Sequence, residues 1–103
     1  MSKSWEKFAE VFEELRASST LLFVESTVHE VLGSFFGKIY AVSVDPPLIG
    51  VERFASRDAV SGSKWVVDVA EGKFFVDDVD RRPWSILALL RAGRISFTKA
   101  KEE

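Results

Sequence analysis

The stretch Lys64-Trp65-Val66-Val67-Asp68-Val69-Ala70-Glu71-Gly72-Lys73-Phe74-Phe75-Val76-Asp77 contains two runs of β-forming residues on either side of Glu71-Gly72. Glycine in so short a connection supplies the positive φ that a tight hairpin turn needs. In the first run, Trp65, Val67 and Val69 face one way, whereas Asp68 faces the other. The stretch therefore predicts a β-hairpin in a sheet with one covered face and one partly wet face.

The residues C-terminal to this stretch predict a charged connection, a helix and a last strand. The connection is Asp77 to Arg82, and Pro83 suits the first turn of a helix that Gly93 would end. The final strand is expected from Arg94 to Thr98. The apolar positions of the expected helix are Trp84, Leu87, Ala88 and Leu90.

The N-terminal third predicts two helices. In residues 3–17, apolar side chains recur at helical spacing among charged ones. Residues 21–25 fit a short buried strand or a lead-in to the next helix. Residues 28–36 follow a capping box, with Thr27 as the cap and Glu30 reaching back, and Gly37 suits the end of a helix.

Between the second helix and the hairpin, the sequence predicts two strands, at 38–44 and 49–54, separated by Asp45-Pro46-Pro47. A polar loop at 56–63 follows, and no internal repeat is evident. We therefore expect an α+β fold in which an antiparallel sheet of four to five strands carries two N-terminal helices and one helix before the last strand.

Length and composition indicate one domain over residues 1–103. The start of the chain lacks the apolar run of a signal peptide, so we expect a cytoplasmic protein without a transmembrane segment. The absence of Asn, Gln and Cys, with a single Met, favours a thermophilic source. No disulfide or thiol chemistry is available, and no cofactor is expected.

Candidate chemistry is sparse. His29 is the only histidine and lies within the capping box, which favours a surface role over catalysis or metal binding. Asp77-Asp78-Val79-Asp80 lacks the spacing of a calcium loop and precedes Arg81 and Arg82, so a solvated turn is expected. An enzyme is the class with the least support, and no catalytic or metal-binding residue is assigned.

Nucleic-acid binding is not expected from a net charge of −2, because phosphates require basic residues gathered on one face. A cluster near the C-terminus keeps contact with nucleic acid or an anionic surface open as an alternative. Its members are Arg81, Arg82, Arg91, Arg94, Lys99 and Lys101, with Trp84 nearby.

The run from Trp65 to Val76, with Trp-Val-Val-Asp-Val followed by Gly-Lys, resembles the central hairpin of sterol carrier protein type-2 domains. Ile86 to Leu90 with Gly93 is similar to a short helix of that family, and Gly37 to Val42 could correspond to its first strand. The segment 46–63 is longer than in the family, and the connection from Val76 to Ile86 is shorter. The resemblance implies helices over a sheet and an apolar tunnel for fatty-acyl or sterol-like lipids.

The leading functional expectation is non-catalytic binding of an apolar, fatty-acyl or lipid-like molecule in a hydrophobic cavity. Periodicity does not separate such a cavity from a filled aromatic core. The alternative is an interaction module that forms a homodimer through sheet edges and aromatic side chains. The side chains expected to line the ligand site are Phe35, Phe36, Phe74, Trp84, Leu87 and Leu90.

Overall fold

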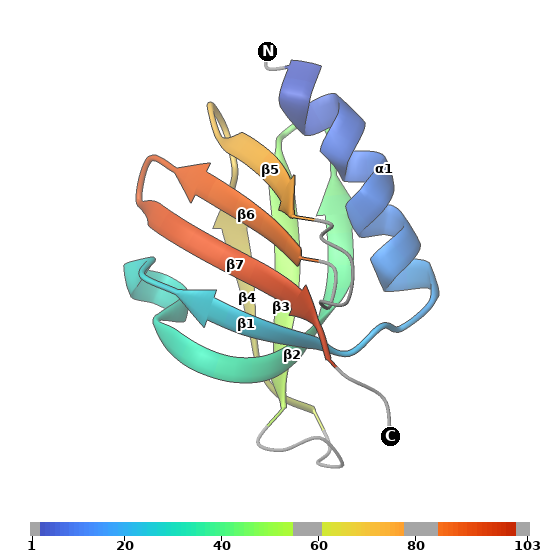
Figure 1. The fold of residues 1–103 in the computed structure, drawn as a ribbon, viewed down its shortest axis with the longest axis vertical. Helices are drawn as coiled ribbons and strands as arrows, with labels where there is room; N and C mark the ends of the chain where they lie inside the picture. The colour runs from blue at the N-terminus through green and yellow to red at the C-terminus, as the bar shows by residue number, and fades with distance from the viewer. Residues whose placement is uncertain (1–2, 55–60, 78–84, 101–103) are drawn as a thin grey trace.

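The computed structural model describes residues 3–54, 61–77 and 85–100. These residues form one antiparallel sheet in the order β4-β3-β2-β1-β7-β6-β5, with a helix against it (Figure 1). The elements in chain order are α1 (Lys3–Ala17), β1 (Leu22–Ser26), the one-turn 3-10 helix η1 (His29–Val31), β2 (Gly33–Ser43), β3 (Leu48–Phe54), β4 (Ser61–Asp68), β5 (Lys73–Asp77), β6 (Ser85–Leu90) and β7 (Gly93–Lys99).

This architecture corrects the predicted fold class. The expected α+β domain had three helices and four to five strands, whereas the described residues contain one α-helix and seven strands. The fold is therefore mostly β. The helix at 3–17 is confirmed, as are the strands at 49–54 and 94–98, and β2 contains most of the strand expected at 38–44.

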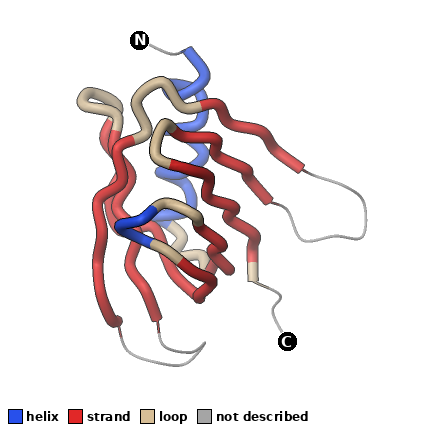
Figure 2. Tube along the Cα trace, turned by 90° about the vertical axis from the view of Figure 1, so that its left-hand side faces the viewer, coloured by secondary structure: helices blue, strands red, loops and turns tan. Residues whose placement is uncertain are grey.

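The sheet rolls into a half-barrel. The four residues 69–72 join β4 to β5, which are the two opposite edges of the sheet, and so short a connection can separate the strand ends by at most about 18 Å. The two edges therefore approach each other at that end. Figure 2 shows the resulting two layers of strands, with α1, in blue, behind and between them in this view.

The core lies between α1 and the inner face of the sheet. Trp5 and Phe12 of α1 are 1% and 0% exposed, and their rings lie 5.4 Å and 6.3 Å from that of Phe74 on β5. Phe12 also meets Phe97 of β7 edge to face, at 5.2 Å between centroids. The helix thus joins the inner side of β5 to that of β7 through aromatic contacts, which stabilise a core beyond their buried area.

The helix predicted at 28–36 is wrong, because this segment forms η1 and the start of β2. A helix would have buried Leu32, which is 63% exposed. Phe35 is buried on the inner face, and the adjacent Phe36 lies on the outer face, as the alternation of a strand requires. The expected cap, Thr27, instead accepts a hydrogen bond at 3.0 Å from the backbone N–H of Arg94.

The helix predicted after Pro83 is also wrong, because residues 85–90 form β6. Ile86 and Ala88 are buried, whereas Leu89 is 39% exposed. Residues 86–90 are apolar at every position, so their period does not distinguish helix from strand. Pairing with β5 on one side and β7 on the other decides it.

The predicted hairpin is wrong in its pairing, although both of its strands form. β4 pairs with β3 and β5 pairs with β6, so the two strands are never neighbours. The connection is still a tight turn, because the backbone N–H of Gly72 donates to the carbonyl of Val69 at 3.0 Å, while the N–H of Val69 donates to the carbonyl of Pro47 at 2.9 Å. Glu71 takes the positive φ of 61°, whereas a Cβ on Gly72 would lie 2.9 Å from the carbonyl oxygen of Val69.

Several sequence predictions fall largely or wholly outside the described residues. They are the start of the third helix at Pro83 and Trp84, the acidic cluster after Asp77, most of the loop at 56–63, and the polar tail after residue 100.

Candidate binding groove beside the helix

The six side chains expected to line one ligand site are not brought together. Phe35, Phe74 and Leu90 lie on the inner face of the sheet, whereas Phe36 and Leu87 lie on the outer face. Trp84 lies outside the described residues. Adjacent strand residues point to opposite faces, so Phe35 and Phe36 cannot line the same cavity.

The inner-facing members of the expected site are part of the core. Phe35 lies 5.6 Å from Trp65 between ring centroids and is 5% exposed. Phe74 is enclosed by α1, with Phe8 stacked on it at 5.3 Å. Leu90 packs against the same buried cluster. None of these three side chains lines any of the pockets described below.

Two adjoining pockets lie between α1 and the turn that joins β2 to β3. They share Val44, which is 45% exposed, and we call them together the helix groove. The first has a volume of about 410 Å³ and is lined by Trp5, Val44, Asp45, Pro47, Val69, Ala70 and Glu71. The second has a volume of about 560 Å³ and is lined by Glu6, Ala9, Glu10, Glu13, Val42 and Val44.

Hydrogen bonds to main-chain carbonyls hold the three segments that build the helix groove. The indole N–H of Trp5 donates to the carbonyl of Ser43 at 3.2 Å, which fixes α1 against the end of β2. The bond from the Val69 N–H to the Pro47 carbonyl holds the β4–β5 connection against the β2–β3 turn. These two hydrogen bonds therefore hold both α1 and the β4–β5 connection against the segment that joins β2 to β3.

The rim of the helix groove is acidic. Glu6, Glu10 and Glu13 follow one another at i, i+4 and i+7, so they lie along one face of α1. Asp45 and Glu71 add carboxylates at the other end. Among the residues that the structure describes, the lining contains no Lys or Arg, although Glu71 forms an exposed ion pair with Arg91 at 3.3 Å.

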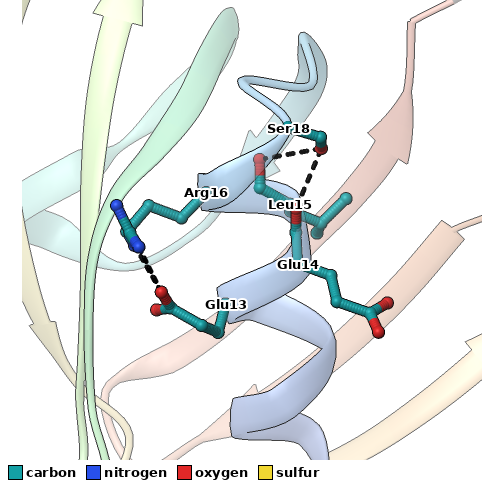
Figure 3. Close-up of polar contacts among 5 residues, drawn as sticks. All are labelled: Glu13, Glu14, Leu15, Arg16 and Ser18. Carbon is teal, nitrogen blue, oxygen red and sulfur yellow. Dashed lines mark hydrogen bonds and ion pairs between the residues drawn. The ribbon is translucent and has the colours of Figure 1, made fainter.

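A second basic residue partly neutralises the rim at the C-terminal part of α1. Arg16 donates from Nε to Glu13 at 2.8 Å and also pairs with it through a terminal nitrogen (Figure 3). This hydrogen bond lowers the pKa of Glu13 below its usual value. Ser18 ends the helix beside it, with its hydroxyl donating to the carbonyl of Glu14 at 2.9 Å.

The outer face of the sheet carries partly exposed aromatic side chains and a polar pocket. Phe23 and Phe36 meet edge to face at 5.5 Å, and the Lys38 ammonium lies 5.3 Å from the ring of Phe54. The pocket, of about 410 Å³, is lined by Glu25, Ser26, Thr27, Gly33, Ser34, Leu87, Arg94 and Ser96. This is where the structure places Leu87.

The described members of the C-terminal basic cluster do not form one patch. Arg91 pairs with Glu71, while Arg94 lines the outer polar pocket. Lys99 lies at the other end of β7 and lines a pocket beside the C-terminal end of α1. The remaining members lie outside the described residues.

No catalytic arrangement emerges from the described residues. His29 is exposed on η1. No group of three or more His, Asp or Glu side chains in the described ranges could hold a metal ion. None of the described helices is both long enough and apolar enough to cross a membrane.

The residues of the helix groove come from three separate segments, which explains why sequence reasoning missed them. Trp5 belongs to the apolar positions of the helix expected at 3–17, Val44 to the end of the strand expected at 38–44, and Pro47 to the connection after it. The Asp45-Pro46-Pro47 signal located that turn, but no local signal indicated that α1 lies against it. No family model, curated protein or solved structure matches the chain.

Proposed function

We propose that the protein binds a small apolar molecule in the helix groove, with a neutral or positively charged end group at the rim. The observation that supports this proposal is an apolar floor of Trp5, Val44 and Val69 that opens to solvent among carboxylates. Ligands often bind at the mouth of a β-barrel, where strand ends leave a concave surface.

The size and chemistry of the floor suit a flexible hydrocarbon chain. The two pockets, of about 410 and about 560 Å³, fall within the usual range of about 300–1,000 Å³ for ligand sites. Each methylene group that leaves water contributes about 0.8 kcal/mol. A chain that spans both pockets could therefore bind without any catalytic side chain.

The carboxylates at the rim of the helix groove restrict the end group that a ligand can carry. A carboxylate on the ligand would face Glu6, Glu10 or Asp45. Two like charges 4 Å apart repel by about 1 kcal/mol in bulk water and by about 4 kcal/mol near a protein surface. An alcohol avoids this repulsion, and an amine turns it into attraction. We therefore propose a long-chain alcohol or amine as the ligand, in place of the fatty-acyl molecule expected from the sequence.

The proposal rests on other residues than those expected from the sequence. Of the five expected residues that the structure describes, none lines the helix groove. The similarity to sterol carrier protein type-2 domains, with its implied tunnel, stays a prediction.

The test uses Trp5 as the reporter. In a Trp65→Phe/Trp84→Phe background it is the only tryptophan, and its emission should shift as a ligand enters the groove. We would titrate dodecylamine, dodecanol and dodecanoic acid below their micelle concentrations. We expect binding by the amine and the alcohol, and binding by the acid that is weaker by about tenfold, equivalent to about 1.4 kcal/mol.

The matched variants place a lysine on one of two exposed valines. Val44→Lys puts it in the groove, and Val66→Lys puts it on β4, where the valine is 58% exposed. We expect Val44→Lys to abolish amine binding and Val66→Lys to retain it. The proposal is wrong if none of the three ligands shifts the emission of Trp5, or if the two variants behave alike. Tighter binding of the acid than of the amine would overturn the ligand class.

A further inference from the structure

The two edge strands carry the same five-residue pattern of charged and apolar side chains. β4 contains Lys64-Trp65-Val66-Val67-Asp68, and β5 is Lys73-Phe74-Phe75-Val76-Asp77. Each begins with a cation, ends with an anion and is apolar between them. Such a strand is complementary to an antiparallel copy of itself, because each Lys then opposes an Asp.

The β5 edge presents apolar surface on both faces. Phe75 lies on the outer face opposite Leu87 of β6 and is 51% exposed. Val76 faces the inner side opposite Ile86 and is 48% exposed. Leu89, opposite Lys73, adds a side chain that is 39% exposed. The ring contacts of α1 with β5 are made by the inward-facing Phe74, and they leave Phe75 and Val76 exposed.

The charged ends of β4 already have partners within the chain. The ammonium of Lys64 lies 3.8 Å from Glu52 and 5.3 Å from the ring of Tyr40. The carboxylate of Asp68 accepts a hydrogen bond at 2.8 Å from the N–H of Ala70. On β5, by contrast, Lys73 makes no ion pair within the described part of the chain. This difference favours β5 over β4 as the edge that takes a partner.

We propose that two copies of this chain associate through β5, paired antiparallel about a two-fold axis at Phe75. Phe75 then opposes Phe75 of the second copy on the outer face, and Val76 opposes Phe74 of the second copy on the inner face. Lys73 occupies the register position opposite Asp77 of the second copy, twice in each dimer. The sheets of the two copies become continuous, and the exposed edge is covered.

The partner is a second copy rather than another protein because the strand matches itself at every position. A two-fold contact is closed, so it gives a dimer and does not extend further. Pairing of β5 with β4 of another copy would also place opposite charges together, but each copy would then bind a further one and form an open-ended polymer. The interface lies outside the helix groove and does not depend on the proposed ligand.

The test is a charge exchange measured by sedimentation velocity. Wild-type protein should dimerise within the range from about 1 μM to about 1 mM, in which small interfaces associate. Lys73→Asp places Asp opposite Asp at both ends of the interface, and Asp77→Lys places Lys opposite Lys. Each variant alone should associate about tenfold more weakly, and an equimolar mixture should regain the wild-type affinity, because both opposed pairs are again of opposite sign.

A cross-link provides a second measurement that does not depend on the charge variants. The chain has no Cys, so Phe75→Cys introduces a single thiol at the two-fold axis, where opposed Cα atoms lie about 4.5–5.5 Å apart and can form a disulfide. Val66→Cys on the outer face of β4 is the matched control. We expect the Phe75→Cys protein to form a covalent dimer on mild oxidation and the Val66→Cys protein, which keeps the β5 interface, to form no covalent dimer.

Three results would overturn the proposal. They are a wild-type protein that stays monomeric over the whole concentration range, a mixture of the charge variants that associates no better than either variant alone, and equal cross-linking at positions 66 and 75. Species larger than a dimer would favour pairing of β5 with β4 and would also refute the two-fold arrangement.

Discussion

Residues 3–17 and residues 28–36 both show apolar side chains at helical spacing, but only the first segment is a helix. In α1 the positions between the apolar ones are mostly charged, and the apolar ones, Trp5, Ala9, Phe12 and Leu15, are buried. In the second segment Leu32 is exposed, and Phe35 and Phe36 point to opposite faces of β2. The remaining positions of 28–36, His29, Glu30, Gly33 and Ser34, are also polar or glycine, so spacing alone does not distinguish the two segments. Pairing of β2 with β1 and β3 makes the second segment a strand from Gly33 onward.

The difference between the two segments is tested most directly by replacing one leucine in each with alanine. Leu15→Ala should lower the free energy of unfolding by about 2–5 kcal/mol, because Leu15 is 5% exposed and its removal leaves a cavity. Leu32→Ala should change it by less than about 0.5 kcal/mol, since the side chain is in contact with water. Urea unfolding followed by circular dichroism measures both values. Equal losses for the two variants would mean that 28–36 buries a helical face.

A smaller effect is expected from Gly37, which the sequence suggested as the end of a helix. It is buried within β2, and a Cβ there would lie 2.8 Å from the backbone carbonyl oxygen of Glu52 on β3. Gly37→Ala should therefore lower the free energy of unfolding by about 1–3 kcal/mol. Ser34→Ala, at an exposed position of the same strand, is the control. An unchanged or higher stability for Gly37→Ala would argue against the close approach of β2 and β3.

The smallest effect concerns the ion pair between Glu13 and Arg16 near the end of α1. The hydrogen bond from Arg16 lowers the pKa of Glu13 in the folded state from 4.5. The pair therefore stabilises the fold above pH 4.5, and this contribution is lost as the pH falls through the lowered pKa. Comparing wild type with Arg16→Met at pH 6 and at successively lower values should reveal the difference only at the higher pH. Because both side chains are exposed, 1 M NaCl should remove most of it.

Parts of the fold could be predicted because their signals are local. The helix at residues 3–17, the Asp45-Pro46-Pro47 turn and the strands on either side of it are of this kind. Residues 86–90 could not be assigned correctly, because a run that is apolar at every position fits a buried strand as well as a buried helix. Their state depends on β5 and β7, which pair with them from both sides.

The residues of the candidate site were harder to predict from the sequence than the elements of the fold. Phe35 and Phe36 were grouped in one site because a helix could have turned both toward the same cavity. Once the segment is a strand, its alternation sends one side chain to the core and the other to the outer face. Trp5 was identified as a buried residue, but its place at the floor of the helix groove depends on the distant Val44 and Val69.

The sequence by itself determined that α1 forms and which of its faces is buried, because the charged and apolar positions of one helix are set by its own residues. It also determined that 64–68 and 73–77 are strands. Only the tertiary structure decided that these strands lie at opposite edges of the sheet. The backbone N–H and C=O groups of a strand can pair with any neighbouring strand that the complete sheet provides. The local sequence therefore does not specify which strand that neighbour is.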